Sequence, residues 1–186
     1  MRRLVALTGF ILSFALAGAA SAQPAPPASR WSFGGTVGAG QVWDDESSLG
    51  SGLLAGGYAD VRLLRLTDLE LSADYLRHKR GTGFFQAEGH MTIVGASIVQ
   101  RFGGDTIKGS VLGGGVMTSH SGTVEFDGRT SARSGTHPGF MFGGGMTVRA
   151  GQRLEMGPVV RFVLVAVDDE TSAAMAWTFG FRVGWR

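Results

Sequence analysis

Histidines and glycine runs are the residues of this chain whose types most readily suggest chemistry. Histidine ligates metals and acts as a base, but no histidine here has another at metal-ligand spacing. The triple-glycine runs at 113–115 and 143–145 could suggest phosphate loops, yet neither lies between a strand and a helix. The sequence therefore predicts no catalytic residue, no metal and no cofactor. The four histidines are His78, His90, His120 and His137.

Charged residues are the second candidate set, because many of them alternate with apolar ones. Five acids and five bases fall on the polar side of such segments, which predicts that they face the inside of a closed structure. A lone buried charge costs several kcal/mol, so these charges must be paired or solvated. We predict a network that plugs the interior, with His90 beside it; a gated ion path through the same charges is the alternative. The predicted lumen charges are Asp60, Arg62, Glu70, Asp74, Glu88, Lys108, Arg149, Glu155, Arg161 and Arg182.

Strands must position these charges, and the last segment of the chain shows the pattern best. In residues 173–186 large apolar side chains take every second position and small or polar ones take the others. A period of two indicates a strand with one apolar face. Large aromatic side chains on that face and small or polar ones opposite are typical of a barrel that turns its apolar face to lipid.

Eight segments share this alternation, and eight is the smallest even number found in bacterial single-chain barrels. In the fourth segment the phase changes at Val94 and Ile98, which predicts a bulge there. The expected fold class is all-β, an eight-stranded antiparallel up-and-down transmembrane β-barrel. The expected strands are 31–43, 52–64, 68–77, 85–101, 106–119, 139–149, 153–167 and 173–186.

The start of the chain reads as an export leader. Arg2 and Arg3 precede an uncharged apolar run, which ends at Ala20-Ser21-Ala22. That run is too short to cross a bilayer as a helix, which takes roughly 20 residues. We expect a cleaved signal peptide at 1–22, a Pro/Ala-rich leader at 23–30 and the barrel at 31–186.

The overall charge gives no sign of a nucleic-acid partner. The chain has 17 basic and 15 acidic residues, and loss of Arg2 and Arg3 with the signal peptide leaves 15 of each. No basic cluster with interleaved aromatic residues is present. There is no cysteine, which excludes disulfides.

The links between strands differ in length on the two sides of the expected barrel. Links near residues 65–67, 102–105 and 150–152 are tight, whereas those at 44–51, 78–84 and 120–138 are longer. Short turns on the side of both termini and longer loops outside are usual for outer-membrane barrels, although the link at 168–171 is short for an external loop. The expected membrane-interface aromatic residues are Trp31, Trp43, Tyr75, Trp177 and Trp185.

With these features, 31–186 resembles the family of small outer-membrane β-barrel domains that includes the membrane domain of OmpA and OmpX. The resemblance rests on the signal peptide, the strand at 69–75, the Gly-Gly-Gly-Met at 143–146 and the aromatic last strand. It implies a monomer in the outer membrane of a Gram-negative bacterium, in contact with lipid and lipopolysaccharide. It also implies that the insertion machinery reads the last strand, although Arg186 follows Trp185 where such chains usually end on the aromatic residue.

The expected function is non-enzymatic, through a loop at 120–138 that contacts a surface protein or lipopolysaccharide. One alternative is a lipid A deacylase, which the resemblance to small barrels also suggests. Such enzymes need a His-x-Ser pair and an acid on the lipid-facing wall, and this motif is absent, since His120 and Ser121 are adjacent. The other alternative is a soluble, lipocalin-like lipid carrier with the apolar face inside. The mixed residues of the loop are Glu125, Phe126, Asp127, Arg129 and Arg133.

Overall fold

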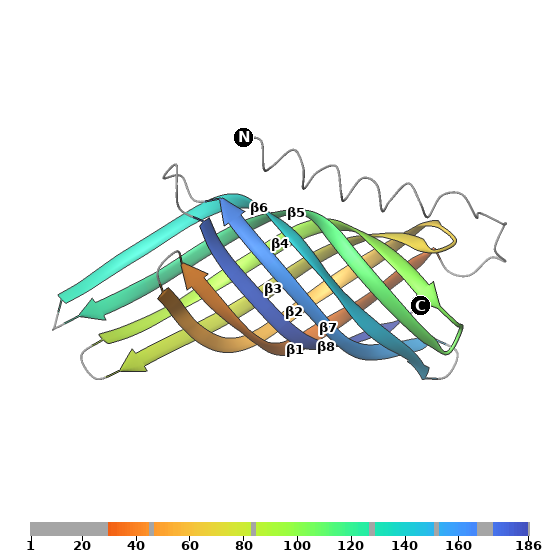
Figure 1. Ribbon diagram of the computed structural model, residues 1–186, viewed down its shortest axis with the longest axis horizontal. Helices are drawn as coiled ribbons and strands as arrows, with labels where there is room; N and C mark the ends of the chain where they lie inside the picture. Colours follow the sequence, from red (N-terminus) through yellow and green to blue (C-terminus); the bar gives the residue numbers. More distant parts are fainter. Residues whose placement is uncertain are drawn as a thin grey trace.

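Eight antiparallel strands close into a barrel (Figure 1). The computed structural model describes residues 30–44, 47–82, 85–126, 129–150, 153–166 and 173–185. Each strand pairs with the next, and the first pairs with the last, so the predicted fold class and strand number are confirmed. The strands are β1 (Trp31–Asp44), β2 (Ser47–Leu64), β3 (Thr67–Thr82), β4 (Phe85–Gly103), β5 (Ile107–Phe126), β6 (Arg129–Ala150), β7 (Leu154–Ala166) and β8 (Ala173–Trp185).

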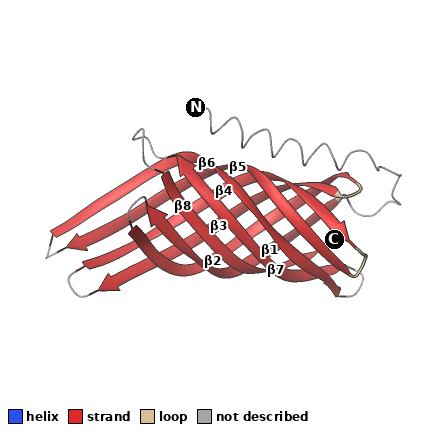
Figure 2. Cartoon of the chain, in the orientation of Figure 1, coloured by secondary structure: helices blue, strands red, loops and turns tan. Residues whose placement is uncertain are grey.

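The described secondary structure consists of strands and the turns between them (Figure 2). None of the described residues belongs to a helix long and apolar enough to span a membrane. The predicted signal peptide at 1–22 and all of the leader except Arg30 lie outside the described residues. So do the predicted link at 168–171 and Arg186.

The alternation of side chains decides which face of each strand turns outward. In β8, Met175, Phe179 and Phe181 are exposed, whereas Ala176 and Arg182 are buried. Because successive side chains of a strand point to opposite faces, one face of β8 forms the outer wall and the other lines the interior. The outer wall is therefore apolar. Other exposed apolar residues include Phe33, Val37, Leu53, Leu71, Val94, Val111, Met117, Phe140 and Met146.

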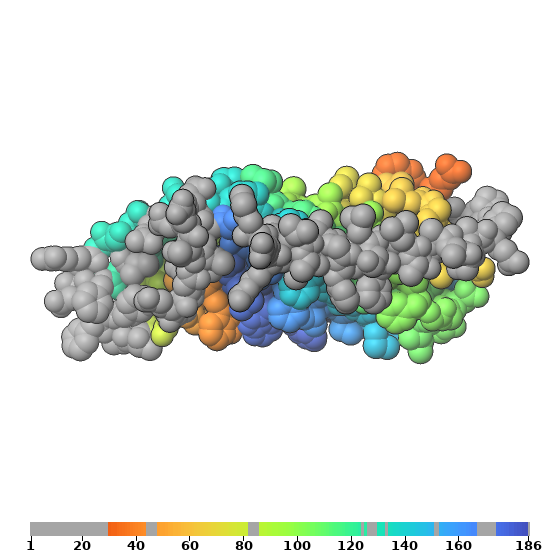
Figure 3. Space-filling view, turned by 45° about the horizontal axis from the view of Figure 1, so that its top comes forward, coloured from red at the N-terminus to blue at the C-terminus, as the bar shows by residue number. Residues whose placement is uncertain are grey.

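The two ends of the barrel differ in build. Residue Arg30, the end of β8 and the short turns β2–β3, β4–β5 and β6–β7 lie at one end, which we call the terminus end. The hairpins β1–β2, β3–β4 and β5–β6 lie at the other, which we call the hairpin end (Figure 1). The space-filling view shows the red-orange start of β1 and the blue-green β5–β6 hairpin at opposite ends of an elongated molecule (Figure 3). The tight turns predicted at 65–67 and 102–105 are confirmed, whereas the predicted link at 150–152 includes residues outside the described ones.

The long loops predicted at the hairpin end are wrong. Strands β5 and β6 continue to the pair Phe126 and Arg129, so the predicted loop at 120–138 is a paired hairpin. Strand β2 likewise begins at Ser47, and β3 runs to Thr82. These strand ends are rich in serine, threonine and glycine because they extend past the apolar outer wall. Without lipid-facing apolar residues at every second position, the strand signal is lost.

The predicted orientation of β4 and its predicted bulge are also wrong. Met91 and Ile93 are buried inside, whereas Glu88 and His90 are exposed on the outer wall. The register of β4 with both neighbours is continuous, and the irregular pairings occur instead at Val42/Trp43 and Arg62/Leu64. The alternation misleads here because the interior at this level is apolar, whereas the outer wall carries the polar residues Glu88 and His90.

The interior contains a charged layer and an apolar layer of side chains, and His78, His120 and His137 lie beyond the apolar layer at the hairpin end. Toward the hairpin end it is an apolar core, in which Leu76 and Ile93 are fully buried. Toward the terminus end it is charged, and Arg161 and Glu70 are equally inaccessible there. Inward charges thus fill only part of the interior. The apolar core comprises Val42, Leu54, Leu76, Met91, Ile93, Val99, Leu112, Val116, Met141, Val163, Val165 and Ala176.

Candidate functional site: a charge network inside the barrel

The charged layer draws its side chains from β2 to β8, which meet because the sheet closes. Glu88 is the one predicted lumen charge that lies elsewhere, on the outer wall. The predicted residues that the structure places inside are Asp60, Arg62, Glu70, Asp74, Lys108, Arg149, Glu155, Arg161 and Arg182.

Arg161 on β7 is the innermost base, with 2% of its surface exposed. Its Nη2 donates to Glu70 Oε1 at 3.0 Å, and its Nη1 donates to an oxygen of Asp74. Glu70 shares its second oxygen with Arg182, whose Nη2 lies 2.6 Å from Oε2. Two arginines and two acids on β3, β7 and β8 thus neutralise one another in a region that solvent does not reach.

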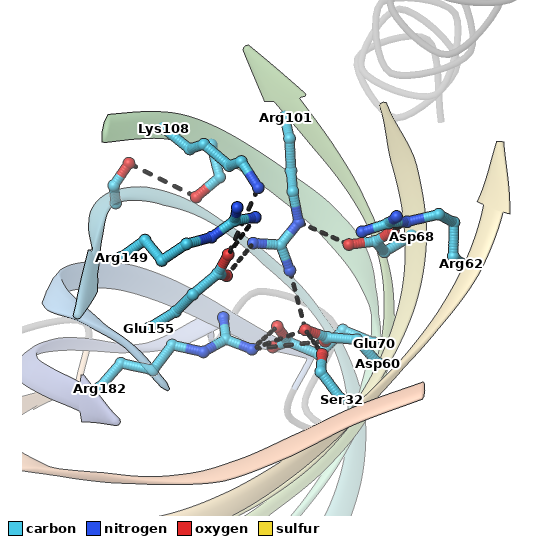
Figure 4. Close-up of polar contacts among 12 residues, drawn as sticks. Ser32, Asp60, Arg62, Asp68, Glu70, Arg101, Lys108, Arg149, Glu155 and Arg182 are labelled. Atoms are coloured by element: carbon cyan, nitrogen blue, oxygen red, sulfur yellow. Dashed lines mark hydrogen bonds and ion pairs between the residues drawn. The ribbon is translucent and has the colours of Figure 1, made fainter. Parts of the chain in front are cut away.

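Arg182 links this core to Asp60 and to an aromatic ring. Its Nη2 lies 3.3 Å from Asp60 Oδ1 (Figure 4). Its guanidinium carbon lies 3.3 Å from the centroid of the Tyr58 ring, which is the geometry of a cation–π contact. A Cβ on Gly184 would overlap the Tyr58 hydroxyl, so a glycine is needed at that position for the ring to fit.

Arg101 on β4 extends the network toward the terminus end. Its Nη2 donates to Asp60 Oδ2 at 2.8 Å, and its Nε donates to Asp68 Oδ2 (Figure 4). Arg62 lies on the far side of Asp68, with its Nε 3.6 Å from Oδ1. The Ser32 hydroxyl donates to Asp60 as well, at 3.0 Å.

Glu155 stands at the open end of the network, close to three bases. Lys108 Nζ is 3.3 Å and Arg149 Nη2 is 3.7 Å from its Oε1, and Arg101 Nη1 is 3.8 Å from its Oε2 (Figure 4). Lys108 and Arg149 are partly exposed, whereas Glu155 is almost buried. We call Lys108, Arg149 and Glu155 the mouth cluster.

Sequence reasoning missed Arg101 and Asp68, although a signal existed for both. Asp68 belongs to the same expected strand as Glu70 and Asp74 and lies an even number of residues from both, so it faces the same side. If Val94 and Ile98 are taken to face outward, every odd-numbered residue of β4 faces the interior, and Arg101 is one of these. Val94 and Ile98, which are both exposed on the outer wall, are the better guide to the orientation of β4.

Glu88 lies in an exposed group of opposite charges on the outer wall. Its Oε1 accepts from Arg77 Nη2 at 2.6 Å, and its Oε2 is 2.9 Å from Lys79 Nζ. Next to it, the Tyr75 and His90 rings stack with centroids 5.6 Å apart. Because these ion pairs are open to solvent, we expect them to add little to stability.

The corrected position of Glu88 can be tested by substitution. We expect Glu88→Gln to leave the guanidinium unfolding midpoint of the lipid-inserted barrel unchanged, because an exposed pair is screened. Glu70→Gln is the matched comparison, since it removes the same charge from the buried network and should lower the midpoint. An equal fall of the unfolding midpoint in the two variants would indicate that Glu88 faces the interior.

The predicted interface aromatic residues lie on the outer wall. Trp31, Trp43, Tyr75 and Trp185 are exposed, with Trp31 at 62%, and Trp177 is partly buried. Trp31 and Trp185 lie at the terminus end, where Trp185 pairs with Phe33, and Trp43 lies toward the hairpin end. A soluble carrier with these rings around an internal pocket is therefore not the arrangement found.

Three of the four histidines lie inside the barrel, and His90 lies on the outer wall. His120 and His137 stack inside the hairpin end with centroids 5.4 Å apart, and His78 Nδ1 lies 3.2 Å from the Leu49 carbonyl oxygen. In the described part of the chain, no three His, Cys, Asp or Glu side chains are grouped so as to hold a metal ion. The charged side chains of the interior pair with one another, whereas Thr118 donates to the His137 carbonyl oxygen.

Solved structures show the same fold. Neisserial surface protein A is 14% identical, with a TM-score of 0.62 over 85% of this chain and 99% of that one. OprG from Pseudomonas aeruginosa is 13% identical, with a TM-score of 0.56 over 83% and 94%. Ail of Yersinia pestis, in complex with the heparin analogue sucrose octasulfate, is 14% identical, with a TM-score of 0.54 over 83% and 99%. No family model and no curated protein matches the sequence.

Proposed function

We propose that this chain, which has the fold of small outer-membrane barrels, is a non-enzymatic outer-membrane protein that presents its hairpin end to the cell exterior. The observation that carries the proposal is the apolar outer wall. Exposed Phe33 and Val37 on β1, Leu53 on β2 and Phe140 on β6 belong to this wall, and a wall of this kind requires lipid around it. An eight-stranded barrel leaves an interior only wide enough for side chains, which supports a closed lumen plugged partly by the charge network.

The β5–β6 hairpin is the proposed interaction surface. Strand β6 pairs with β7 only from Gly139 onward, whereas its pairing with β5 continues to Arg129. Among the described residues, no strand pairs with 129–138 on the side away from β5. Toward the described residues, the backbone N–H and C=O groups on that side of the edge have no strand partner, which suits strand addition by another chain.

Lipopolysaccharide is the proposed neighbour of the outer wall at the hairpin end. Arg77 and Lys79 are more than half exposed and share one carboxylate, Glu88, so the group keeps one positive charge. It lies directly beyond Tyr75 and Leu71 on the same face of β3. Cations at the edge of the apolar belt can pair with the phosphates of lipid headgroups.

Cysteine labelling tests the orientation, because the chain has no cysteine of its own. Thr130→Cys and Ser134→Cys lie in the hairpin, and Asp105→Cys lies in the β4–β5 turn; all three positions are exposed. With a membrane-impermeant maleimide on intact cells, we expect labelling of the two hairpin variants only. Asp105→Cys should react only after the outer membrane is permeabilised.

Two controls complete this experiment. The unboiled protein should migrate faster than the boiled protein on a gel, and it should need detergent for extraction. Labelling of Asp105→Cys in intact cells would contradict the orientation. Heparin-coated beads then probe the surface role, because 129–138 has basic but no acidic residues: a bulky maleimide on Ser134→Cys should reduce binding of the cells, and unchanged binding would argue against the hairpin.

A further inference from the structure

We propose that the interior of the barrel binds an ordered water molecule between Thr36 on β1 and Asp74 on β3, above Gly56 on β2. The inference goes beyond the proposed function, because it depends neither on the orientation of the barrel nor on its surface role. Thr36 Oγ1 and Asp74 Oδ1 are buried, and neither atom has a hydrogen-bond partner in the protein. The two residues are 2% and 4% exposed. Buried polar atoms are nearly always hydrogen-bonded, either to the protein or to an ordered water.

The register places the two oxygens on either side of a glycine. Thr36 pairs with Gly56, and Gly56 pairs with Asp74, so the three residues form one row across β1, β2 and β3. A Cβ on Gly56 would overlap Asp74 Oδ1, because the carboxylate leans over the glycine toward β1. Residues directly opposite each other on neighbouring strands have Cβ atoms roughly 5 Å apart, so Oδ1 lies about that far from Thr36 Cβ. One water with two hydrogen bonds of about 2.8 Å covers this gap.

The methyl group of Thr36 restricts the direction of its hydroxyl. Thr36 Cγ2 lies 2.7 Å from the position that a Cβ on Gly180 would take, so the methyl group is directed toward β8. The hydroxyl is the other substituent of the same carbon, and it therefore points away from that contact. On the opposite side of Thr36 the paired residue is Gly56, which has no side chain to fill the space.

Larger side chains enclose this space along the barrel. Leu54 and Tyr58 flank Gly56 on the inner face of β2, and Leu76 follows Asp74 on the inner face of β3. Both leucines belong to the apolar core and are at most 4% exposed. The site thus lies where the charged layer meets the apolar core, and the core closes it toward the hairpin end.

Water fits the site better than a cation does. The other oxygen of Asp74 already accepts from Arg161, so the carboxylate is neutralised without a further positive charge. A metal cation would need several oxygen ligands close to that guanidinium, whereas Thr36 and Asp74 supply two. Water can accept from the Thr36 hydroxyl and donate to Asp74 Oδ1 at the same time. It therefore satisfies both atoms and adds no charge.

Thr36→Val tests the site, because it replaces the hydroxyl with a methyl group of nearly the same shape. If a water links the two oxygens, the variant loses a hydrogen bond. We then expect the unfolding equilibrium constant of the lipid-inserted barrel in guanidinium to rise roughly fivefold. If the hydroxyl is buried without any partner, the same change removes a desolvation cost and the constant falls. A constant that is unchanged or lower would overturn the proposal.

Thr118→Val is the matched comparison for this measurement. The Thr118 hydroxyl is as deeply buried as that of Thr36, but it donates to the His137 carbonyl oxygen at 3.1 Å. We expect the two variants to lose stability to a similar extent, since each loses one hydrogen bond of a buried hydroxyl.

A crystal structure of the protein in detergent would reveal the ligand directly. We expect one peak of electron density within about 3.2 Å of both oxygens, which Thr36→Ser retains because it keeps the hydroxyl and which Thr36→Val loses. The absence of a peak in the unsubstituted protein would overturn the site. An anomalous peak at the same place after soaking in rubidium chloride would overturn the assignment to water and indicate a cation instead.

Discussion

Replacing Arg161 with methionine is expected to lower the free energy of unfolding by about 3–5 kcal/mol, the usual loss when one partner of a buried ion pair is removed. Arg161 is 2% exposed and donates to Glu70 and Asp74. Without it, Glu70 keeps Arg182, whereas Asp74 loses the base that neutralises it. Guanidinium unfolding of the lipid-inserted barrel, followed by tryptophan fluorescence, measures the loss.

A second substitution separates charge from packing. Arg161→Met with Asp74→Asn removes the carboxylate that has lost its partner, and we expect it to recover more than half of the lost stability. Arg77→Gln is the control for an exposed arginine and should leave the midpoint unchanged. If Arg161→Met behaves like Arg77→Gln, the buried network contributes nothing to stability.

Gly38→Ala is expected to disturb the closure of the barrel at the seam between β1 and β8. Gly38 pairs directly with Gly180 at the seam between β1 and β8. A Cβ at this position would overlap the Phe179 carbonyl oxygen and lie 2.5 Å from Gly180 Cα. Since these are backbone atoms, the strands themselves must move apart. We expect a loss of about 3 kcal/mol, at the upper end for overpacking.

Gly35→Ala provides a control on the same strand with the same added methyl group. A Cβ on Gly35 would meet Gly56 O at 3.5 Å, which is ordinary van der Waals contact. The fraction of heat-modifiable protein after refolding into vesicles should therefore fall for Gly38→Ala and stay unchanged for Gly35→Ala. Equal fractions would show that the seam has room for a side chain.

The sequence predicted the barrel well wherever one face of a strand meets lipid. In β8, the alternation of Phe179 and Phe181 with Gly180 and Arg182 follows directly from that contact. The rule failed in two places for the same reason. Met91 and Ile93 line an apolar interior, and the residues of the β5–β6 hairpin have no lipid on either face. The alternation of side chains gives the orientation of a strand only where its outer face meets lipid and its inner face lines a polar interior.

The members of the charge network were more predictable than its pairing. The alternation of apolar and polar residues along the strands correctly predicted that Glu70, Asp74 and Arg161 all face the interior. That Arg161 meets Glu70 and Asp74, and that Arg182 bridges Asp60 and Glu70, depends on the stagger between strands distant in the sequence. Local alternation carries no information on that stagger, because it is fixed only when β1 joins β8.

The apolar core toward the hairpin end determines what an ion inside the barrel would meet. Charged side chains could exchange partners and carry an ion through the charged layer, but the next layer toward the hairpin end is mostly apolar. Leu76, Ile93, Met141 and Val163 are each no more than 1% exposed, so this section forms an apolar barrier of low dielectric constant. Narrow apolar sections of this kind block conduction by excluding water. Permeation would therefore require the apolar section to be hydrated, and rearranging the salt bridges alone would not open a path.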